Sequence, residues 1–458
     1  MKLLLFLAVA WAAPGRGLLE KPPATVWESG RALDTVVVKL HDDVKGTPRL
    51  AGTEVRPLFE ADARVLAQER RKYGTHLADL GRYFWVSTPP GAAPAVADAF
   101  NEMDWVELAY LAFLPQPPPS DIPPTTPDFT ELQVWLDAAP SGFGFGEGER
   151  WPGGDGSHVT IADIEYGWTA DHEDLGQVDP VVGWGWDSGE YAFHGTGVLG
   201  ILVGGDNGYG VMGGAPGASA MVISPFETSE VYSVAAAIYG ATELLDAGDV
   251  ILIEQQSMAH DSYAPVEIEA AVFDAIAWAV TKGITVVEPS GNGAQDLDAA
   301  HWHNAFDPRA RDSGAILVGG GASPVSGYEP RTWYPGGSCY GERVDVQGWF
   351  DGIVTTINTD LGGDYADLWV ADTNAHPSGD PRQAYTTLFG GTSGASPQVA
   401  AAVAVANSVA IEVRGEPLSP DEVRDLMRAT GTTQPADDPY PIGPQPNLRN
   451  MIRYGVLP

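Results

Sequence analysis

Short apolar runs alternate with longer apolar helical runs over the larger, second part of the chain. A short run that is almost continuously apolar is typical of a strand buried on both faces of a sheet. Strands that alternate with helices in this way form a parallel sheet with helices on both faces, and ligands bind at the carboxyl ends of its strands. The expected strands are 158–165, 220–224, 249–254, 284–289 and 315–319, and the expected helices are 194–204, 229–247, 266–282 and 394–413.

The first part of the chain has a different pattern, which predicts a small α+β domain over residues 30–114. A proline-rich stretch, PQPPPSDIPPTTPDF, follows it, so residues 115–130 are expected to form an extended linker without a helix. The main domain would then occupy residues 131–458. The strands expected in the small domain are 34–40, 82–87 and 106–112, and its helices are 57–73 and 93–103.

Composition limits the class of protein. The 458 residues are 44% hydrophobic, which is enough to bury large cores. The net charge of -36 gives a surface that repels phosphate backbones, so nucleic acid is excluded as a partner. The single cysteine, Cys339, excludes an internal disulfide, and we expect a monomer.

The N-terminus, MKLLLFLAVAWAAPG, combines a lysine, an apolar run and small residues around Ala10 and Ala12. This is the layout of a signal peptide, predicted over residues 1–12. We therefore expect a protein that is secreted, or periplasmic in transit. No other apolar run is long enough on this pattern to cross a bilayer, so no membrane anchor is expected.

The most specific motif is GGTSGASPQVAAAVAVA, which begins at Gly390. A glycine turn here delivers Ser393 to the start of an alanine-rich helix, where free backbone N–H groups can stabilise an oxyanion. Serine and threonine are also ordinary helix N-caps. The run GTSGASP is far more specific than a cap requires, which favours a nucleophile.

Two further motifs precede it in the chain. HGTGVLG begins at His194, and GNG at 291–293 follows an expected strand. A serine needs a base to become a nucleophile, and histidine is the usual one, although a lone histidine is more often structural. Asn292 could be a simple turn residue, or it could direct its amide at a developing oxyanion.

Together these motifs resemble those of the subtilisin-like serine proteases. Residues 391–397 match the family's GTSxASP, and residues 194–200 match HGTxVAG with Leu199 in place of alanine. Residues 289–292 stand at the family's AAGN. The order of the motifs along the chain is also that of the family.

The resemblance implies a subtilisin-like α/β fold and hydrolysis of peptide bonds through an acyl-enzyme, with no cofactor needed for the chemistry. Ser393 would be the nucleophile, His194 the general base and Asn292 the oxyanion donor. Family members usually carry a ferredoxin-like propeptide that blocks the cleft, and residues 30–114 have a compatible pattern, with a permanent accessory domain as the alternative. Polypeptide substrates and the protein's own propeptide are thus the expected partners.

The stretch IADIEYGW at 161–168 offers two carboxylates for the triad acid. In the family the acid lies seven residues before the histidine of HPDL, and counting back from His172 of HEDL gives Glu165. The following glycine agrees, since Asp-x-Gly becomes Glu165-Tyr166-Gly167. A glutamate can hold a histidine tautomer as an aspartate does. Asp163 competes, because it shares the strand face at ~6.6 Å distance.

The resemblance also suggests residues of the substrate cleft. Where the family commonly has MSLG, this chain has LIEQQS at 252–257, so Glu254, Gln255 and Gln256 would bring polar or acidic character there. A wall of the pocket for the side chain before the scissile bond is expected from three consecutive residues, Pro289, Ser290 and Gly291.

Metal sites find little support in the sequence. His301 and His303 could suggest a pair of ligands, but no third ligand stands at a suitable spacing. Acidic loops such as 359–373 would permit structural calcium, yet none has the ligand spacing of an EF-hand. We therefore expect no catalytic metal and leave calcium unassigned.

Three alternatives remain beside the secreted endopeptidase. GTSGA loosely fits the serine motif of an esterase-type α/β-hydrolase, but there the serine precedes the histidine. Serine-carboxyl peptidases use a Glu/Asp pair with a serine in a related fold, which the intact motif at His194 disfavours. A catalytically impaired homologue that binds peptides is the third, and the altered acid at Glu165 is its one sign.

Overall fold

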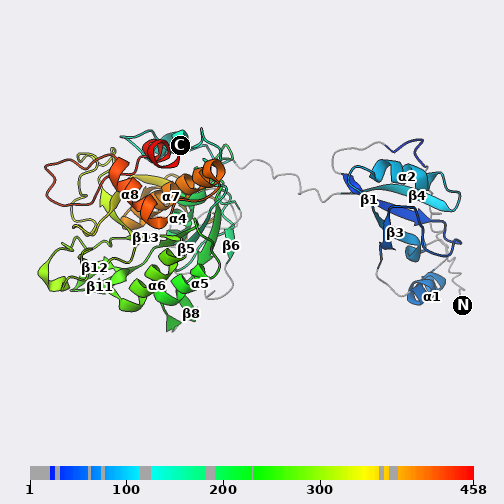
Figure 1. Ribbon diagram of the computed structural model, residues 1–458, viewed down its shortest axis with the longest axis horizontal. Coiled ribbons are helices and arrows are strands. Elements are labelled where there is room, and N and C mark those ends of the chain that lie inside the picture. The colour runs from blue at the N-terminus through cyan, green and yellow to red at the C-terminus, as the bar shows by residue number, and fades with distance from the viewer. Residues whose placement is uncertain are drawn as a thin grey trace, which may run out of the picture. The chain divides into compact units, whose positions relative to one another are not determined.

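The computed structural model describes residues 21–25, 31–59, 63–73, 78–113, 125–176, 178–180, 191–228, 231–359, 366–370 and 380–457. The chain divides into two compact units, Met1–Pro123 and Pro124–Pro458 (Figure 1). Each unit is described by itself. The predicted signal peptide, 1–12, and residues 115–124 of the predicted linker lie outside the described residues.

The first unit is a four-stranded antiparallel sheet in the order β2-β3-β1-β4, with α2 packed on β1 and β4. The helix expected from residue 57 begins later, because Glu54–Pro57 pair with β3 as an edge strand. Proline has no N–H to donate, so an edge position suits Pro57. The elements are β1 (Arg31–Leu40), β2 (Glu54–Pro57), α1 (Ala63–Tyr73), η1 (Leu80–Arg82), β3 (Tyr83–Ser87), α2 (Ala93–Asn101) and β4 (Val106–Phe113).

The second unit is built on a seven-stranded sheet in the order β15-β14-β13-β10-β5-β7-β6, in which every pair is parallel. This confirms the predicted α/β class, and each of the five expected strands is present. The strands β6 and β15 were not predicted. The sheet consists of β5 (Thr160–Ile164), β6 (Val178–Pro180), β7 (Ser219–Ile223), β10 (Val250–Ile253), β13 (Thr285–Pro289), β14 (Ile316–Gly321) and β15 (Val346–Trp349).

Helices cover both faces of this sheet, with α5 and α6 on one side and α4 and α7 on the other (Figure 1). Their bounds are α4 (Ala192–Val203), α5 (Val234–Thr242), α6 (Ala270–Thr281) and α7 (Thr392–Arg414). In β10, Val250 and Leu252 pack in the core with α4 and α7, whereas Ile251 and Ile253 pack with α5 and α6. Because successive strand residues alternate between faces, residues 163, 165 and 254 belong to the α4 and α7 face.

The α7 helix is long and apolar enough to cross a membrane by composition alone, which the sequence analysis did not count. In the fold, 94% of its most apolar window is buried, so it is the core helix of this unit. The remaining elements are η2 (Thr130–Leu132), η3 (Val134–Leu136), α3 (Phe145–Gly148), β8 (Phe226–Thr228), β9 (Val231–Tyr232), β11 (Gln256–Ala259), β12 (Ser262–Pro265), η4 (Val266–Ile268), η5 (Ala300–Trp302), β16 (Ile353–Ile357), β17 (Trp369–Val370), β18 (Ala384–Phe389), α8 (Pro420–Thr430), α9 (Leu448–Met451) and η6 (Ile452–Val456).

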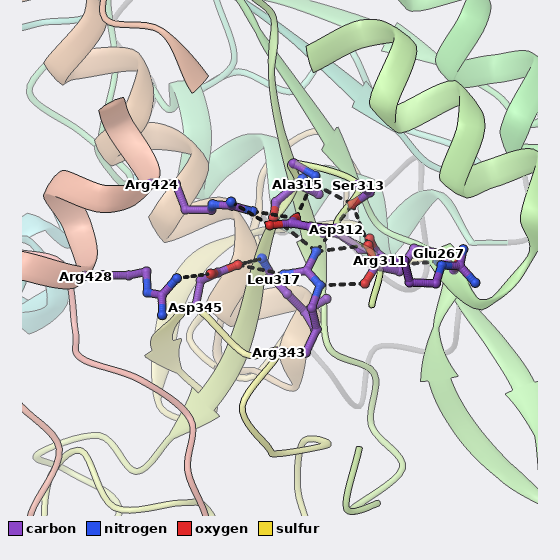
Figure 2. Close-up of polar contacts among 12 residues, drawn as sticks. Glu267, Arg311, Asp312, Ser313, Ala315, Leu317, Arg343, Asp345, Arg424 and Arg428 are labelled. Carbon is purple, nitrogen blue, oxygen red and sulfur yellow. Dashed lines mark hydrogen bonds and ion pairs between the residues drawn. The ribbon is translucent and has the colours of Figure 1, made fainter. Parts of the chain in front are cut away.

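A buried arginine, Arg343, connects the segments that precede α6 and β15 (Figure 2). Arg343, 2% exposed, donates to both carboxylate oxygens of Glu267 at 2.7 and 2.9 Å and to Asp345 at 2.8 Å. Glu267 precedes α6, and Asp345 precedes β15 and accepts from the backbone N–H of Leu317 in β14. The guanidinium thus ties three segments together. Removing it would leave the buried Glu267 carboxylate without its cation, whereas Asp345 would keep its contact with Arg428 at 3.4 Å.

Candidate active site

Ser393 is the second residue of α7, at the helix end that points at a cleft. Gly391 precedes the helix with a φ of 78°, a left-handed conformation that favours glycine. A side chain there would also come within 3.2 Å of Asn292 Oδ1. At the start of α7, the N–H of Thr392 donates to Asn292 and those of Gly394 and Ala395 donate to Gly391 O, so the N–H of Ser393 and the positive end of the helix dipole are what this end offers a ligand.

His194 lies in the first turn of α4, which packs closely against the end of β5. A Cβ on Gly195 would lie 2.3 Å from the carbonyl oxygen of Gly167 and 2.8 Å from Glu165 Cγ. Only a glycine therefore allows the helix to approach this closely. The approach brings the His194 imidazole to the Glu165 carboxylate.

Glu165 follows β5 directly and is 2% exposed. Its Oε2 is hydrogen-bonded to His194 Nδ1, and its Oε1 accepts from the N–H of Tyr166 at 2.7 Å. Burial alone would lower the pKa of His194, but the charge and hydrogen bond of Glu165 raise that pKa above its usual value. With Nδ1 engaged, Nε2 is the ring nitrogen left for a proton transfer.

Asp163 has no direct bond to His194. It lies in β5, two residues before Glu165, and is fully buried. Its Oδ2 accepts a hydrogen bond from Trp168 Nε1 at 2.7 Å. Its Oδ1 is buried without a hydrogen-bond partner. Burial, and next the charge of Glu165, raise the pKa of Asp163 well above its usual value. Of the two carboxylates in IADIEYGW, the fold thus brings Glu165 to the imidazole.

The orientation of the Asn292 amide is fixed by α7. Its Oδ1 lies 2.9 Å from the backbone N–H of Thr392 and 3.1 Å from that residue's hydroxyl. A backbone N–H can only donate, so the contacting atom is the amide oxygen. The amide nitrogen is then left as a donor for the cavity that Asn292 lines.

All four predicted catalytic residues line a single cavity of about 310 Å³. A second cavity, of about 490 Å³ and rich in aromatic side chains, adjoins it at His194. The first is lined by Glu165, Tyr166, Tyr191, His194, Glu254, Gln255, Gln256, Tyr263, Pro289, Asn292, Thr392 and Ser393. The second is lined by Phe193, His194, Tyr334, Phe350, Asp351, Gly352, Ile357, Thr386, Thr387, Leu388, Phe389, Gly390 and Gly391.

The predicted pocket wall is only partly present. Pro289 lines the first cavity, whereas the Ser290 side chain is fully buried and donates to the carbonyl of Cys339 at 3.1 Å. Gly291 is not among the lining residues, because it packs against the backbone of Ala264 in β12. The hairpin of β11 and β12, which the sequence did not predict, occupies that side.

Glu254, which was expected to bring acidic character to the cleft, is among the residues that line the first cavity. It is 7% exposed, and its Oε1 lies 2.7 Å from Ser396 Oγ of α7, a contact that the sequence analysis did not predict. Its N–H continues the pairing of β10 with β5, donating to Ile164 O at 3.1 Å. The alternation along β10 was the signal that would have placed it beside Glu165.

Among the described residues, one group could supply three metal ligands, namely Glu165, His194 and Glu254, whose ligand atoms lie within 4.8 Å of one another. The direct hydrogen bond between Glu165 and His194 leaves no room for an ion between them, and it fits a proton-transfer pair instead. His301 is not in this group, and its ring packs against His260. Most of the acidic loop 359–373 lies outside the described residues.

Comparisons with known proteins show the family and the fold. The model of the subtilase family matches residues 159–451. Among solved structures, fervidolysin from Fervidobacterium pennivorans, described as a keratinolytic enzyme related to subtilisin, is similar with a TM-score of 0.51 and 16% identity. The match covers 96% of this chain and 63% of fervidolysin.

A protease from Pseudoalteromonas arctica gives a TM-score of 0.50 at 17% identity, over 72% of this chain and 99% of that one. A search of the curated proteins gave no significant match. The structural likenesses concern the fold, while the family match covers more than half of the chain and includes every motif of the cavity. This chain therefore belongs to the subtilase family.

Proposed function

We propose that this protein is a secreted subtilase in which Ser393, His194, Glu165 and Asn292 carry out peptide-bond hydrolysis. The observation that carries the assignment is the hydrogen bond between the buried Glu165 carboxylate and His194 Nδ1, in the cavity that Ser393 also lines. The acid of the triad is then a glutamate.

The chemistry follows from these positions. His194 Nε2 takes the proton of Ser393 Oγ as the oxygen attacks the substrate carbonyl, and Glu165 stabilises the imidazolium that results. The Asn292 amide nitrogen and the backbone N–H of Ser393 at the start of α7 donate to the oxyanion. The imidazolium then gives its proton to the leaving amine, and water releases the acyl group by the same steps.

An endopeptidase must hold the substrate chain on both sides of the scissile bond. The two cavities, of about 310 and 490 Å³, share His194 as a lining residue, so a substrate chain that occupied both would pass the proton-transfer group. The second contains Phe193, Tyr334, Phe350 and Phe389, which suits apolar substrate side chains. This favours cleavage within a chain over removal of a terminal residue.

The first unit would be a propeptide that is removed on maturation. Its antiparallel sheet with α2 on one face fits the ferredoxin-like pattern that the family resemblance implies, and the alignment with fervidolysin extends over 96% of the chain. Secretion rests on the sequence of residues 1–12. Ser393→Ala should therefore accumulate at the size of the precursor, whereas the wild type should lose roughly its first 115–150 residues.

The decisive experiment combines a fluorophosphonate probe with turnover of casein. The wild type should be labelled and active, and Ser393→Ala should show neither property. Glu165→Ala should lose most of the turnover, whereas Asp163→Ala, its matched control on the same strand, should lose far less. A folded wild type that neither labels nor cleaves casein would instead support the catalytically impaired, peptide-binding alternative.

A further inference from the structure

Three buried carboxyl groups surround one imidazole in this site. Asp163, Glu165 and Glu254 lie on the same face of the sheet, and His194 is the one basic side chain among them in the described cavity. Glu165 is engaged with His194, whereas Asp163 Oδ1 and Glu254 Oε2 are buried without partners. Three negative charges beside one cation would be very costly in a site so poorly hydrated.

The contacts of Ser396 indicate where one proton lies. Ser396 Oγ is 2.7 Å from Glu254 Oε1 and 2.7 Å from the carbonyl oxygen of Thr392. A hydroxyl has a single proton, and a carbonyl can only accept. When Ser396 donates to Thr392, as a serine inside a helix commonly does to the fourth residue before it, the contact with Glu254 needs a proton on the carboxyl group.

We propose that Glu254 is a positioning residue of the catalytic machinery, a neutral carboxylic acid that donates to Ser396 and whose ionisation switches off Ser393. This rests on the proposed function of Ser393. Burial, followed by the charge of Glu165, raises the pKa of Glu254 well above its usual value, which agrees with the neutral form.

The surroundings of Glu254 define what its ionisation would do. The acidic groups are Glu165 and Asp163 from β5 and its end, the base is His194 from α4, and the hydroxyls are Ser393 and Ser396 from α7. The phenols around the same cavity are those of Tyr166, Tyr191 and Tyr263.

An ionised Glu254 would affect catalysis in two ways. The Glu254 carboxylate would accept a hydrogen bond from the Ser393 hydroxyl. It would thus compete with His194, which lines the same cavity, for the hydroxyl proton of Ser393. Its charge would also oppose the oxyanion that forms between Ser393 and Asn292. Neutral Glu254 does neither, so activity should fall when this acid loses its proton.

The test is the pH profile of kcat/KM for the full chain after maturation, from about pH 5 to 10, with folding checked by circular dichroism. The wild type should lose activity about tenfold or more on the alkaline side. Glu254→Gln keeps a neutral donor but cannot ionise, so the alkaline fall of its kcat/KM should be abolished. Glu243→Gln, which removes one charge from an exposed pair with Lys282, should keep the wild-type profile.

A second variant, Ser396→Ala, tests the inference even if Glu254→Gln does not fold, through the direction in which the alkaline fall moves. Ser396→Ala removes the acceptor of the Glu254 proton, so the alkaline fall should move to lower pH. If Ser396 instead donates to an ionised Glu254, the same variant should move the fall to higher pH. That result would overturn the inference.

Three other results would overturn it. They are a wild-type profile without an alkaline fall, a Glu254→Gln profile with the fall unchanged, and a folded Glu254→Gln enzyme that is inactive at every pH. In each case fluorophosphonate labelling of the wild type would leave the function of Ser393 intact. Absence of that labelling would overturn both proposals together.

Discussion

Replacement of Glu165 tests the reassignment of the triad acid most directly. Glu165→Gln removes the charge that raises the pKa of His194 and offers an amide that no longer enforces the required tautomer. A change of this kind in a Ser-His-acid triad lowers kcat by about 10⁴-fold, or about 5.5 kcal/mol of transition-state stabilisation. We expect a loss of that order.

Glu165→Asp separates distance from charge. Shortening the side chain by one C–C bond withdraws the carboxylate by about 1.5 Å, so the direct bond to His194 Nδ1 is broken while the charge stays close. A hydrogen bond to a charged group contributes about 1.5–3 kcal/mol, which predicts a loss of roughly 10- to 100-fold. Aspartate, the usual triad acid of the family, would thus give a lower activity than glutamate at position 165 of this protein.

The assay is kcat/KM on a fluorogenic peptide at neutral pH, with circular dichroism as a control for folding. Asp163→Asn is the matched control, because Asp163 shares the strand face but bonds to Trp168 instead of His194. Its activity should stay within about fivefold of the wild type. The reasoning fails if Asp163→Asn is as damaging as Glu165→Gln, or if Glu165→Gln keeps more than about a tenth of the activity.

Other changes have separate expected outcomes. Asn292→Ala should lower kcat by about 10²–10³-fold in steady-state kinetics, and a smaller loss would remove it from the oxyanion site. Arg343→Met should lower the free energy of unfolding in urea by about 3–5 kcal/mol, whereas Arg309→Met, 77% exposed, should leave it nearly unchanged. Burial would raise the pKa of Asp312, but its bonds from Arg424 lower it to about 2. Stability from Asp312 is therefore complete above about pH 4 and lost as pH falls toward 2, and Asp312→Asn should remove this part of the acid dependence in urea titrations.

Much of the main sheet could be predicted because its strands are buried on both faces. Runs such as HVTIADIE and ITVVEP are rich in apolar residues on both faces, and each forms a strand within two residues of the expected bounds. The missed strands of this sheet, β15 and β6, are its two edge strands. The strand β6 has three residues, which is too short to show a clear apolar period.

In the candidate site, too, some residues could be predicted from the sequence and others could not. Ser393, His194 and Asn292 stand in local motifs whose glycines are required by close approaches such as that of Gly195 to Gly167, so their identity is visible in the sequence. The pocket wall could not be predicted from the sequence, because Ser290 is buried through a contact with Cys339, which is distant in the chain.

The sequence by itself determined the family, the parallel sheet and the order of the catalytic motifs, because these depend on residue type and on spacing along the chain. It left Glu165 and Asp163 in competition. The tertiary structure decided between them, since only the packing of α4 on the end of β5 sets which carboxylate reaches the imidazole. It also brought Glu254 beside Ser396 from a strand far away in the chain, and a buried carboxyl group acquires its protonation state from such neighbours.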